Sequence, residues 1–376
     1  MNTVRVCIDA TPLLLRSAGV KTYVYYWIQA LRKQLGDASV GVFPPIGAPG
    51  ACVHDRSVTT PLRTLAGLAC LHSANASPVR LLNAFGSQID VFHASHQLLK
   101  PPSNTRVSAT LYDMTCWLVP HMHSAANVRM AKKFADRVLR RADGLVAISQ
   151  ATKADAVRIL NLDPDRIAVI YPGVAEAFFQ TYPKPAGKPY ILFIGTVEPR
   201  KNVGVLLDAY EQLPGQLRGE FDLVLAGSPG WGDPAIMNRL HSGIPGVRYL
   251  GYVSEADLPA LNAGATLFVY PSLYEGFGLP VAQAMAAGVP VITSNVSSLP
   301  EVASGAGILV DPTRPEALAE AFVRMLSDSA LRQRCAVQGQ TRAQTFRWRN
   351  CALESVRFFE HLAQGQPAAS LATSSV

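Results

Sequence analysis

The sequence predicts an α/β fold with two doubly wound parallel sheets, because short apolar strands alternate with helices along both halves of the chain. Its 376 residues are enough for two domains, and a hydrophobic content of 49% is typical of globular proteins with filled cores. A stretch rich in Pro, Lys and Gly at 181–189 interrupts the alternation, which then restarts. We therefore expect a first domain over 1–173, a linker over 174–189 and a second domain over 190–345.

Composition argues against several kinds of protein. The net charge of +7 and the pI of about 9.1 favour anionic partners, but no signature of a nucleic-acid module is present. The six cysteines are scattered, so neither a zinc site nor a disulfide framework is indicated. The N-terminus lacks the features of a signal peptide, and the longest apolar run, 276–292, is broken by Pro and Gly. A cytoplasmic protein is the expectation.

In the first half, a strand over 4–9 precedes a loop that ends at Gly19, and a helix over 22–35 follows. Gly19 can approach a phosphate or simply form a turn. Residues 41–80 show little pattern and are interpreted as surface loops with a short helix. Further strands are expected over 88–94, 106–114, 144–149 and 166–171, with Ser149 capping the helix that begins near Thr152. One of these strands carries Asp113 to its carboxyl end, where a ligand contact and a turn or cap role are both open.

A helix expected over 127–142 carries many cations and one acid, Asp136, beside an apolar stripe. The cations are Arg129, Lys132, Lys133, Arg137, Arg140 and Arg141. Such a helix can lie on an anionic membrane, and it can equally be an ordinary solvated face. Peripheral contact with the inner face of the plasma membrane is therefore one expectation.

The second half begins with a strand over 190–195, and Arg200 and Lys201 lie beyond its end. A helix over 203–213 comes next, with Asn202 expected as its N-cap. Two cations beyond a strand and beside a helix N-terminus can converge on an anion. Further strands are expected over 221–227, 248–253, 266–270 and 289–293, a capping box at 254–257 opens another helix, and 315–362 is helical. The composition after residue 364 predicts a disordered tail over 365–376.

The loop over 271–279 is the strongest candidate site. Glu275 and the following Gly276–Gly278 come between a strand and a helix that begins at about Pro280, at the edge where parallel sheets bind ligands. Glycines let backbone N–H groups approach a phosphate, and the helix N-terminus adds positive potential. A carboxylate there suits a neutral polyol beside the phosphate, as in a sugar diphosphate. The alternative is that Glu275 is an exposed loop acid and the glycines only form a turn.

Four segments, in their order and spacing, resemble the retaining glycosyltransferases of family 4. They are 193–202, 250–254, 271–280 and 294–301. The forms Ser-Leu-Tyr-Glu-Gly-Phe-Gly and Thr-Val-Glu-Pro-Arg-Lys-Asn are similar to those of bacterial mannosyltransferases of surface-polysaccharide synthesis. The resemblance covers nearly the whole chain. It implies the GT-B fold, in which two Rossmann-like domains face an interdomain cleft and a C-terminal helix, here 346–364, crosses back to the first domain.

The resemblance also implies roles for individual residues. Glu275 would hold hydroxyls of the donor sugar, whereas Arg200 and Lys201 would bind the diphosphate and stabilise it as it leaves. Further contacts with the nucleotide sugar would come from Gly19, Thr196, Tyr252, Val253, Gly276, Phe277, Gly278 and Leu279, although Tyr252 and Val253 can also be strand-end packing. Gln283 stands where the family has an acid that contacts the ribose, and glutamine can still bond to ribose hydroxyls. Tyr112 replaces a histidine that relatives often place before the acid that is Asp113 here, a catalytic candidate on the acceptor side.

The expected reaction moves mannose from GDP-mannose to a lipid-linked saccharide or oligosaccharide acceptor, with retention of configuration, and needs no metal or other cofactor. It would serve the synthesis of O-antigen, capsule or exopolysaccharide. Two alternatives stay open. One is a degenerate protein that binds nucleotide sugar without transferring it, which Gln283 and Tyr112 favour. The other is an epimerase or phosphorylase of the same fold, which would need paired acids with a histidine, or a lysine for pyridoxal phosphate.

Overall fold

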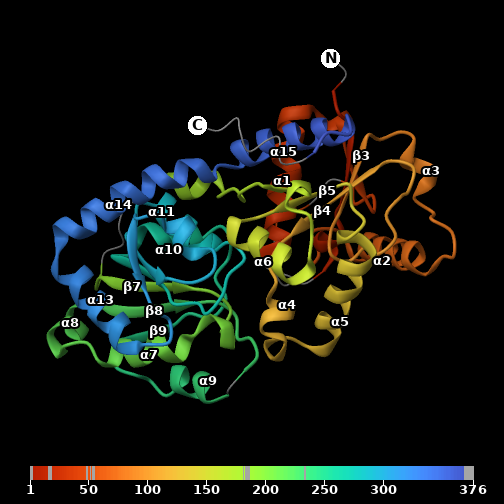
Figure 1. Cartoon of the computed structure of the whole chain (residues 1–376). Coiled ribbons are helices and arrows are strands. Elements are labelled where there is room, and N and C mark those ends of the chain that lie inside the picture. The colour runs from red at the N-terminus through yellow and green to blue at the C-terminus, as the bar shows by residue number, and fades with distance from the viewer. Residues whose placement is uncertain are drawn as a thin grey trace. The chain divides into compact units, whose positions relative to one another are not determined.

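The computed structural model describes residues 3–15, 19–47, 50, 52, 56–180, 182, 187–232 and 234–367. The chain forms two compact units (Figure 1). One consists of Met1–Gly173 together with Trp348–Val376, and the other of Val174–Arg347. The first unit is therefore built from two separate stretches of chain, and the second from one.

The first unit is built on a six-stranded sheet with the strand order β2-β1-β3-β4-β5-β6. Its strands are β1 (Val6–Asp9), β2 (Val40–Phe43), β3 (Val91–Ala94), β4 (Arg106–Leu111), β5 (Gly144–Ala147) and β6 (Ile167–Val169). All neighbouring strands are parallel. Their apolar side chains are buried on both faces, as the consecutive residues Val91 and Phe92 show, because neighbours along a strand point to opposite faces. Parallel pairing requires crossover connections, and the alternation of strands and helices supplies them.

The helices of this unit are α1 (Gly19–Leu35), α2 (Pro61–Ala76), α3 (Asn83–Gly86), α4 (Thr115–Leu118), α5 (Ala125–Phe134), α6 (Gln150–Leu160) and α15 (Trp348–Ala363). α15 packs along α1 (Figure 1), and Trp27 Nε1 donates a hydrogen bond of 2.9 Å to Ser355 Oγ between them. Both side chains are fully buried. A Cβ added to Gly173 would lie only 2.3 Å from Cδ2 of Trp348, so this glycine makes room for the indole. α15 is thus part of the core of the first unit.

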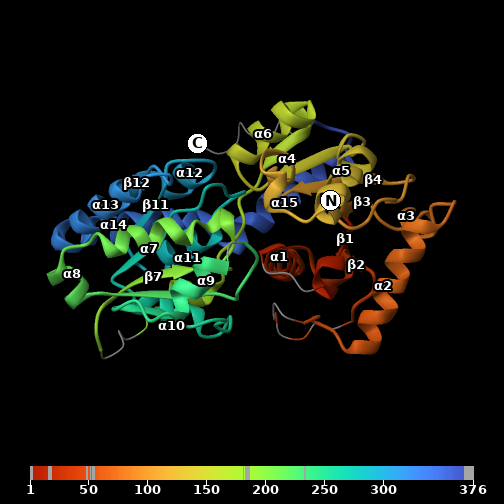
Figure 2. The same cartoon turned by 90° about the horizontal axis from the view of Figure 1, so that it is seen from below.

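Two helices of the first unit differ from the sequence prediction. α2 has 16 residues where only loops and a short helix were expected. Its apolar side chains lie on all sides and give no one-sided pattern: Leu62 and Leu65 are 77% and 67% exposed. Figures 1 and 2 both place α2 at the edge of the unit. The basic helix begins at Ala125, capped by Ser124, and continues as a π-helical turn over Ala135–Leu139 instead of an α-helix to residue 142.

The second unit has another six-stranded parallel sheet, in the order β12-β11-β10-β7-β8-β9. Its strands are β7 (Tyr190–Ile194), β8 (Asp222–Ala226), β9 (Val247–Tyr249), β10 (Leu267–Tyr270), β11 (Val291–Ser294) and β12 (Gly307–Val310). β7 and β10 are hydrogen-bonded neighbours, with Leu267 opposite Ile191 and Phe268 opposite Leu192. Because the carboxyl ends of parallel neighbours lie at one edge of the sheet, the loops that follow β7 and β10 are brought together.

The helices of the second unit are α7 (Val203–Glu211), α8 (Gly215–Glu220), α9 (Pro234–His241), α10 (Leu258–Gly264), α11 (Leu279–Ala286), α12 (Leu299–Ala303), α13 (Pro315–Ser327) and α14 (Ser329–Ala343). In Figure 1, α10 and α11 lie on one side of the sheet, and α7 and α9 on the other. The predicted capping box at 254–257 is wrong. Ser254 Oγ donates to the Asp257 carboxylate over 2.6 Å within a turn, and α10 begins only at Leu258.

Part of the predicted linker over 174–189 packs against the second unit. The Val174 amide donates to the Phe346 carbonyl over 2.6 Å, and Arg347 pairs with Glu176 over 2.7 Å. Residues 181 and 183–186 of the linker, and 368–376 of the predicted tail, lie outside the described residues. Across the described part of the chain, no helix combines the length and the apolar composition that crossing a membrane requires.

Candidate active site

The turn after β7 and the loop after β10 meet at the carboxyl edge of the second sheet. Pro199–Lys201 forms one turn of 3-10 helix after β7. The Leu273 amide, in the loop after β10, donates a hydrogen bond of 2.9 Å to the Arg200 carbonyl. The backbones of the two candidate loops are therefore joined directly, which fixes the side chains that they carry relative to each other.

Glu275 is held between two cations. Lys201 Nζ lies 2.6 Å from Glu275 Oε1, and Arg200 Nη1 lies 2.8 Å from Oε2. Glu275 is 7% exposed and Lys201 is 8% exposed. These values rule out an exposed loop acid beside solvated cations. These distances show that the three side chains lie together, while their forming a donor site and their roles toward a donor stay predictions.

Two further residues belong to this cluster, and neither was predicted from the sequence. Glu198 Oε1 lies 2.7 Å from Arg200 Nη2, and the carboxylate is buried. Tyr270, the last residue of β10, places its hydroxyl 2.5 Å from Lys201 Nζ. The sequence feature that could have revealed Glu198 as part of the cluster is its position two residues before Arg200, in the same loop. For Tyr270 no signal existed, because an aromatic residue ending an apolar strand is ordinary core.

The ionisation of the cluster follows from burial and from these neighbours. Burial disfavours a charged Glu275, but Arg200 and then Lys201 outweigh burial and lower the pKa of Glu275 to about 2. Burial lowers the pKa of Lys201, and Glu275 opposes that shift. For Arg200, burial also lowers the pKa, but Glu275 and Glu198 outweigh it and raise the value. The cluster thus contains an ionised acid in a mostly buried setting.

The loop after Glu275 leads into α11 through Gly278. Gly278 has φ of +95°, and a Cβ there would lie 2.6 Å from Cδ2 of Leu299, so only glycine fits this position. The Glu275 amide donates to Ser297 Oγ over 3.0 Å, and Ser298 Oγ donates to the Glu275 carbonyl over 2.9 Å. These bonds tie the backbone of Glu275 to the segment after β11, which fixes the direction of its carboxylate.

The other predicted donor contacts of the second unit lie around the same sheet edge. Gly276 and Phe277 are buried, and the Phe277 ring meets the Phe346 ring edge-on at 5.2 Å. Leu279 is the first residue of α11, and Gln283 lies within that helix, 7% exposed. Thr196 follows β7 and is half-buried. Tyr252 and Val253 follow β9, where Tyr252 is 44% exposed and Val253 is half-buried.

Asn202 does not cap α7 with its side chain as predicted. Its backbone is left-handed, with φ of +60°, and its side chain makes no capping bond. Instead, Asn202 Nδ2 donates to the carbonyls of Pro271 and Pro312, over 3.1 and 2.6 Å. The residue therefore fastens the end of the cationic turn to the loop that carries Glu275. Sequence alone does not reveal this role, because both acceptors are far away along the chain.

The remaining site candidates belong to the first unit. Gly19 is exposed at the start of α1, and nothing lies within 4 Å of a Cβ added there. Asp113 Oδ1 accepts hydrogen bonds from the amide and the hydroxyl of Thr115, over 3.0 and 2.6 Å. Asp113 therefore has the geometry of a turn acid, which was the alternative to a ligand contact. The Tyr112 ring meets the Tyr23 ring edge-on at 5.6 Å, and burial raises the pKa of Tyr112.

A metal site does not emerge from the part of the chain that the structure describes. No group of three or more His, Cys, Asp and Glu side chains there is arranged to hold an ion. His93 illustrates the reason, since both of its ring nitrogens are hydrogen-bonded to hydroxyls, Ser108 Oγ at 2.9 Å and Thr110 Oγ1 at 2.8 Å. Burial lowers the pKa of this histidine to about 3, which keeps the ring neutral.

Each of the two units matches the model of a known protein family. Residues 174–342 match the model for glycosyl transferases group 1, and residues 17–178 match the model for glycosyltransferase family 4. An O-antigen chain mannosyltransferase B from Escherichia coli is 34% identical over 284 residues, which is 72% of this chain and 74% of that protein. The chain belongs to the family 4 glycosyltransferases. It is a hexosyltransferase, which is the class of enzyme to which its named relative belongs.

Two further comparisons relate this glycosyltransferase to a longer mannosyltransferase and to a solved structure. The serotype-specific mannosyltransferase WbdA from Escherichia coli is 30% identical over 242 residues, which is 60% of this chain but only 29% of WbdA. The solved structure of sucrose-phosphate synthase from Thermosynechococcus elongatus superposes with a TM-score of 0.72 at 22% identity, covering 97% of this chain and 100% of that one. This likeness shows that the fold is GT-B.

A glycosyltransferase needs a way to stabilise the anion that leaves the donor sugar. Arg200 and Lys201 supply two positive charges at one edge of the sheet, in a largely dry setting where charges interact strongly. Glu275 balances part of that charge and keeps acceptor capacity, since each carboxylate oxygen can accept more than one hydrogen bond. The arrangement can therefore bind an anion and a polyol side by side.

Proposed function

We propose that the enzyme transfers mannose from GDP-mannose to a lipid-linked saccharide, with retention of anomeric configuration, during synthesis of a bacterial surface polysaccharide. The observation that carries this proposal is the clamp of Lys201 and Arg200 around Glu275. The choice of mannose is supported by the relatives, which are named as mannosyltransferases. The choice of acceptor is supported by the O-antigen chain in the name of one of them.

The proposed mechanism is mainly electrostatic. The bond between the anomeric carbon and the diphosphate oxygen breaks, the oxygen of the acceptor hydroxyl bonds to that carbon, and the hydroxyl proton passes to the departing diphosphate. Negative charge grows on the departing diphosphate, and Arg200 and Lys201 stabilise it more strongly in a partly dry site than water would. Glu275 orients the donor sugar through its hydroxyls, and the amide of Gln283 binds the ribose.

A ligand screen identifies the donor. The protein is heated with GDP-, UDP-, ADP- and dTDP-sugars, and the ligand that binds the folded state raises the melting temperature by mass action. We expect the largest increase with GDP-mannose. A larger increase with a uridine or adenine nucleotide sugar would contradict the proposed donor and leave the family assignment intact.

Turnover of the Lys201→Ala variant tests the site. Loss of one group that stabilises the leaving anion costs about 2–4 kcal/mol of barrier, so we expect transfer to slow by about a hundredfold or more. Lys188→Ala is the matched control, because Lys188 is a cation of the same unit that pairs with Asp222 over 2.7 Å outside the cluster. Near-normal transfer by Lys201→Ala would contradict the proposed site.

A protein that binds the donor without transferring it is the alternative function, and Gln283 favours it because the family has an acid there. Hydrolysis of the donor separates the two functions. A transferase slowly releases sugar to water when no acceptor is present, and a binding protein does not. Donor binding without release or transfer, across a set of lipid-linked acceptors, would support the alternative.

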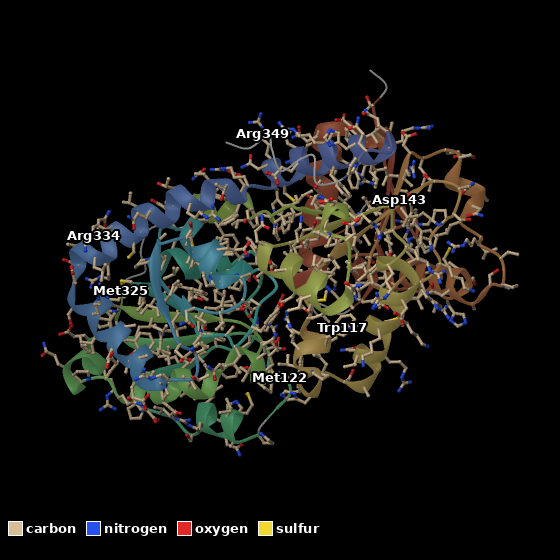
Figure 3. The ribbon with its side chains drawn as sticks, viewed as in Figure 1. Trp117, Met122, Asp143, Met325, Arg334 and Arg349 are labelled. Carbon is tan, nitrogen blue, oxygen red and sulfur yellow. The ribbon has the colours of Figure 1, made fainter. Side chains whose placement is uncertain are left out.

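Peripheral membrane contact through α5 is part of the proposal. The cations of α5 and of the turn that follows it are all exposed, and they attract anionic lipid headgroups. Replacing Lys132 and Lys133 by Ala should reduce sedimentation with vesicles that contain anionic lipid, and salt should reduce it for the unchanged protein. Arg334→Ala is the control, since Arg334 is an exposed cation on α14 of the other unit (Figure 3). Equal binding by all three proteins would rule out α5.

A further inference from the structure

The ammonium group of Lys201 has a definite set of neighbours. It has three N–H donors, of which one is directed to Glu275 Oε1 at 2.6 Å and one to the Tyr270 hydroxyl at 2.5 Å. The same nitrogen lies 4.9 Å from the centroid of the Tyr270 ring. Among the residues that the structure describes, protein groups accept two of the three donors, and the third can meet a ligand.

Tyr270 is itself fixed in place. It is 1% exposed, and its ring stacks on Phe193 at 5.8 Å and on Phe268 at 6.0 Å. Its carbonyl accepts a hydrogen bond of 2.9 Å from Thr293 Oγ1 on the neighbouring strand β11. A hydroxyl carried by such a ring cannot follow a mobile partner, so it restricts where the ammonium group can lie.

We propose that Tyr270 is a positioning residue for the transfer reaction, which holds the Lys201 ammonium group so that its remaining N–H donor meets the donor diphosphate. This inference rests on the function proposed above for Lys201. The Tyr270 hydroxyl touches neither sugar nor phosphate in this arrangement. It acts through the lysine by accepting one of its hydrogen bonds.

The hydroxyl also favours the charged form of the lysine. Burial lowers the pKa of Lys201, and Arg200 adds to that shift, whereas Glu275 and Glu198 oppose it. A hydrogen bond accepted from the ammonium group stabilises the protonated form, so its loss should lower the pKa further. Lysine in the variant would then lose its proton at a lower pH than in the unchanged enzyme.

The Tyr270→Phe variant tests the inference, because it removes the hydroxyl and keeps the stacked ring. We expect transfer near neutral pH to slow by about tenfold, and the alkaline limb of the rate profile to move to lower pH. Tyr210→Phe is the matched control. Tyr210 is also buried in the second unit, and its hydroxyl is also hydrogen-bonded: it shares its proton between the carbonyls of Phe221 and Gly246, at 2.9 and 3.2 Å.

The outcomes separate this inference from the function on which it rests. If Lys201→Ala transfers sugar at the normal rate, the proposed role of the lysine is wrong. If Lys201→Ala is slow and Tyr270→Phe matches the unchanged enzyme at every pH, the positioning role is overturned. It is also overturned if Tyr270→Phe loses rate and melting temperature only as Tyr210→Phe does, with the alkaline limb unmoved. Loss of rate with a moved limb, absent in Tyr210→Phe, supports it.

Discussion

Glu275 is a buried acid that depends on its two cationic neighbours for its charge. With a pKa of about 2, against an ordinary value of 4.5, it binds its proton less tightly in the folded protein than in the unfolded chain. A group of this kind contributes stability above its unfolded pKa. That contribution is lost as the pH falls from about 4.5 toward about 2.

Glu275→Gln should therefore lower the free energy of unfolding at pH 7 by about 3 kcal/mol, because it leaves Arg200 and Lys201 buried with less opposite charge. The difference from the unchanged protein should shrink below pH 4. Melting temperatures of both proteins between pH 2 and pH 7 measure this. Parallel curves over that whole range would contradict the ion-pair cluster.

At this scale the sequence revealed the cluster only in part. Arg200, Lys201 and Glu275 were found because each lies beyond the end of an apolar strand, where ligands bind. Tyr270 was not found, since its ring is core and only its hydroxyl is functional. Asp113 shows the opposite limit, because a short acid at a strand end can equally bond to its own turn, as it does with Thr115.

At the scale of elements, the loop between β10 and α11 depends on a backbone that only glycine adopts easily. Gly278 has a positive φ of +95°, and a Cβ added there would lie 2.6 Å from Cδ2 of Leu299. Gly305 has a similar φ of +81°, but nothing lies within 4 Å of a Cβ added there. Substituting these two glycines in turn therefore distinguishes the cost of backbone strain, which both would have, from the cost of a steric clash with a neighbour, which only Gly278 would have.

We expect Gly305→Ala to lower the free energy of unfolding by about 1 kcal/mol and Gly278→Ala to lower it by at least about 2 kcal/mol. Only Gly278→Ala should also weaken donor binding, because its loop carries Glu275. Denaturant unfolding and the thermal shift with donor measure the two effects. Equal losses in both variants would show that the contact with Leu299 is unimportant.

Elements with one clear signal were predicted well, and elements with competing signals were not. The strand β7 was predicted because it is a continuous apolar run, and Ser149 was predicted as a cap, which its bond of 2.9 Å from the Thr152 amide confirms. The helix α2 was missed because exposed leucines hide its period. Asn202 was taken for a cap because its residue type favours one, but its side chain bonds to two distant carbonyls.

At the scale of the whole molecule, the two parallel sheets followed from the alternation of strands and helices. The break at 181–189 does not mark the start of the second unit, which begins at Val174 and so includes the predicted linker. Only the family resemblance predicted that α15 belongs to the first unit, because the apolar face of a helix does not indicate which domain core it packs against. In the structure, Trp27 and Ser355 make that connection through a buried hydrogen bond.

Phe358 on α15 tests how much the first unit depends on this helix. It is fully buried, and a Cβ added to Gly144 of β5 would lie 3.0 Å from its ring. Phe358→Ala should lower the free energy of unfolding of the first unit by about 3–5 kcal/mol, whereas Leu353→Ala on the exposed side should cost less than about 1 kcal/mol.

Tryptophan fluorescence can follow this unfolding, because Trp27, Trp117 and Trp348 belong to the first unit and only Trp231 to the second. Trp117 is visible on α4 in Figure 3. A transition midpoint in Phe358→Ala equal to that in Leu353→Ala would show that α15 contributes little to the first unit.

Because α15 closes the first unit from a distant part of the chain, the order of synthesis matters for this protein. Residues 174–347 leave the ribosome before α15 does, so the second unit can finish folding while the first still lacks a helix. Until then the indole of Trp27 has no cover on that side. A nascent chain that stalls before Trp348 would present this apolar surface to chaperones and proteases.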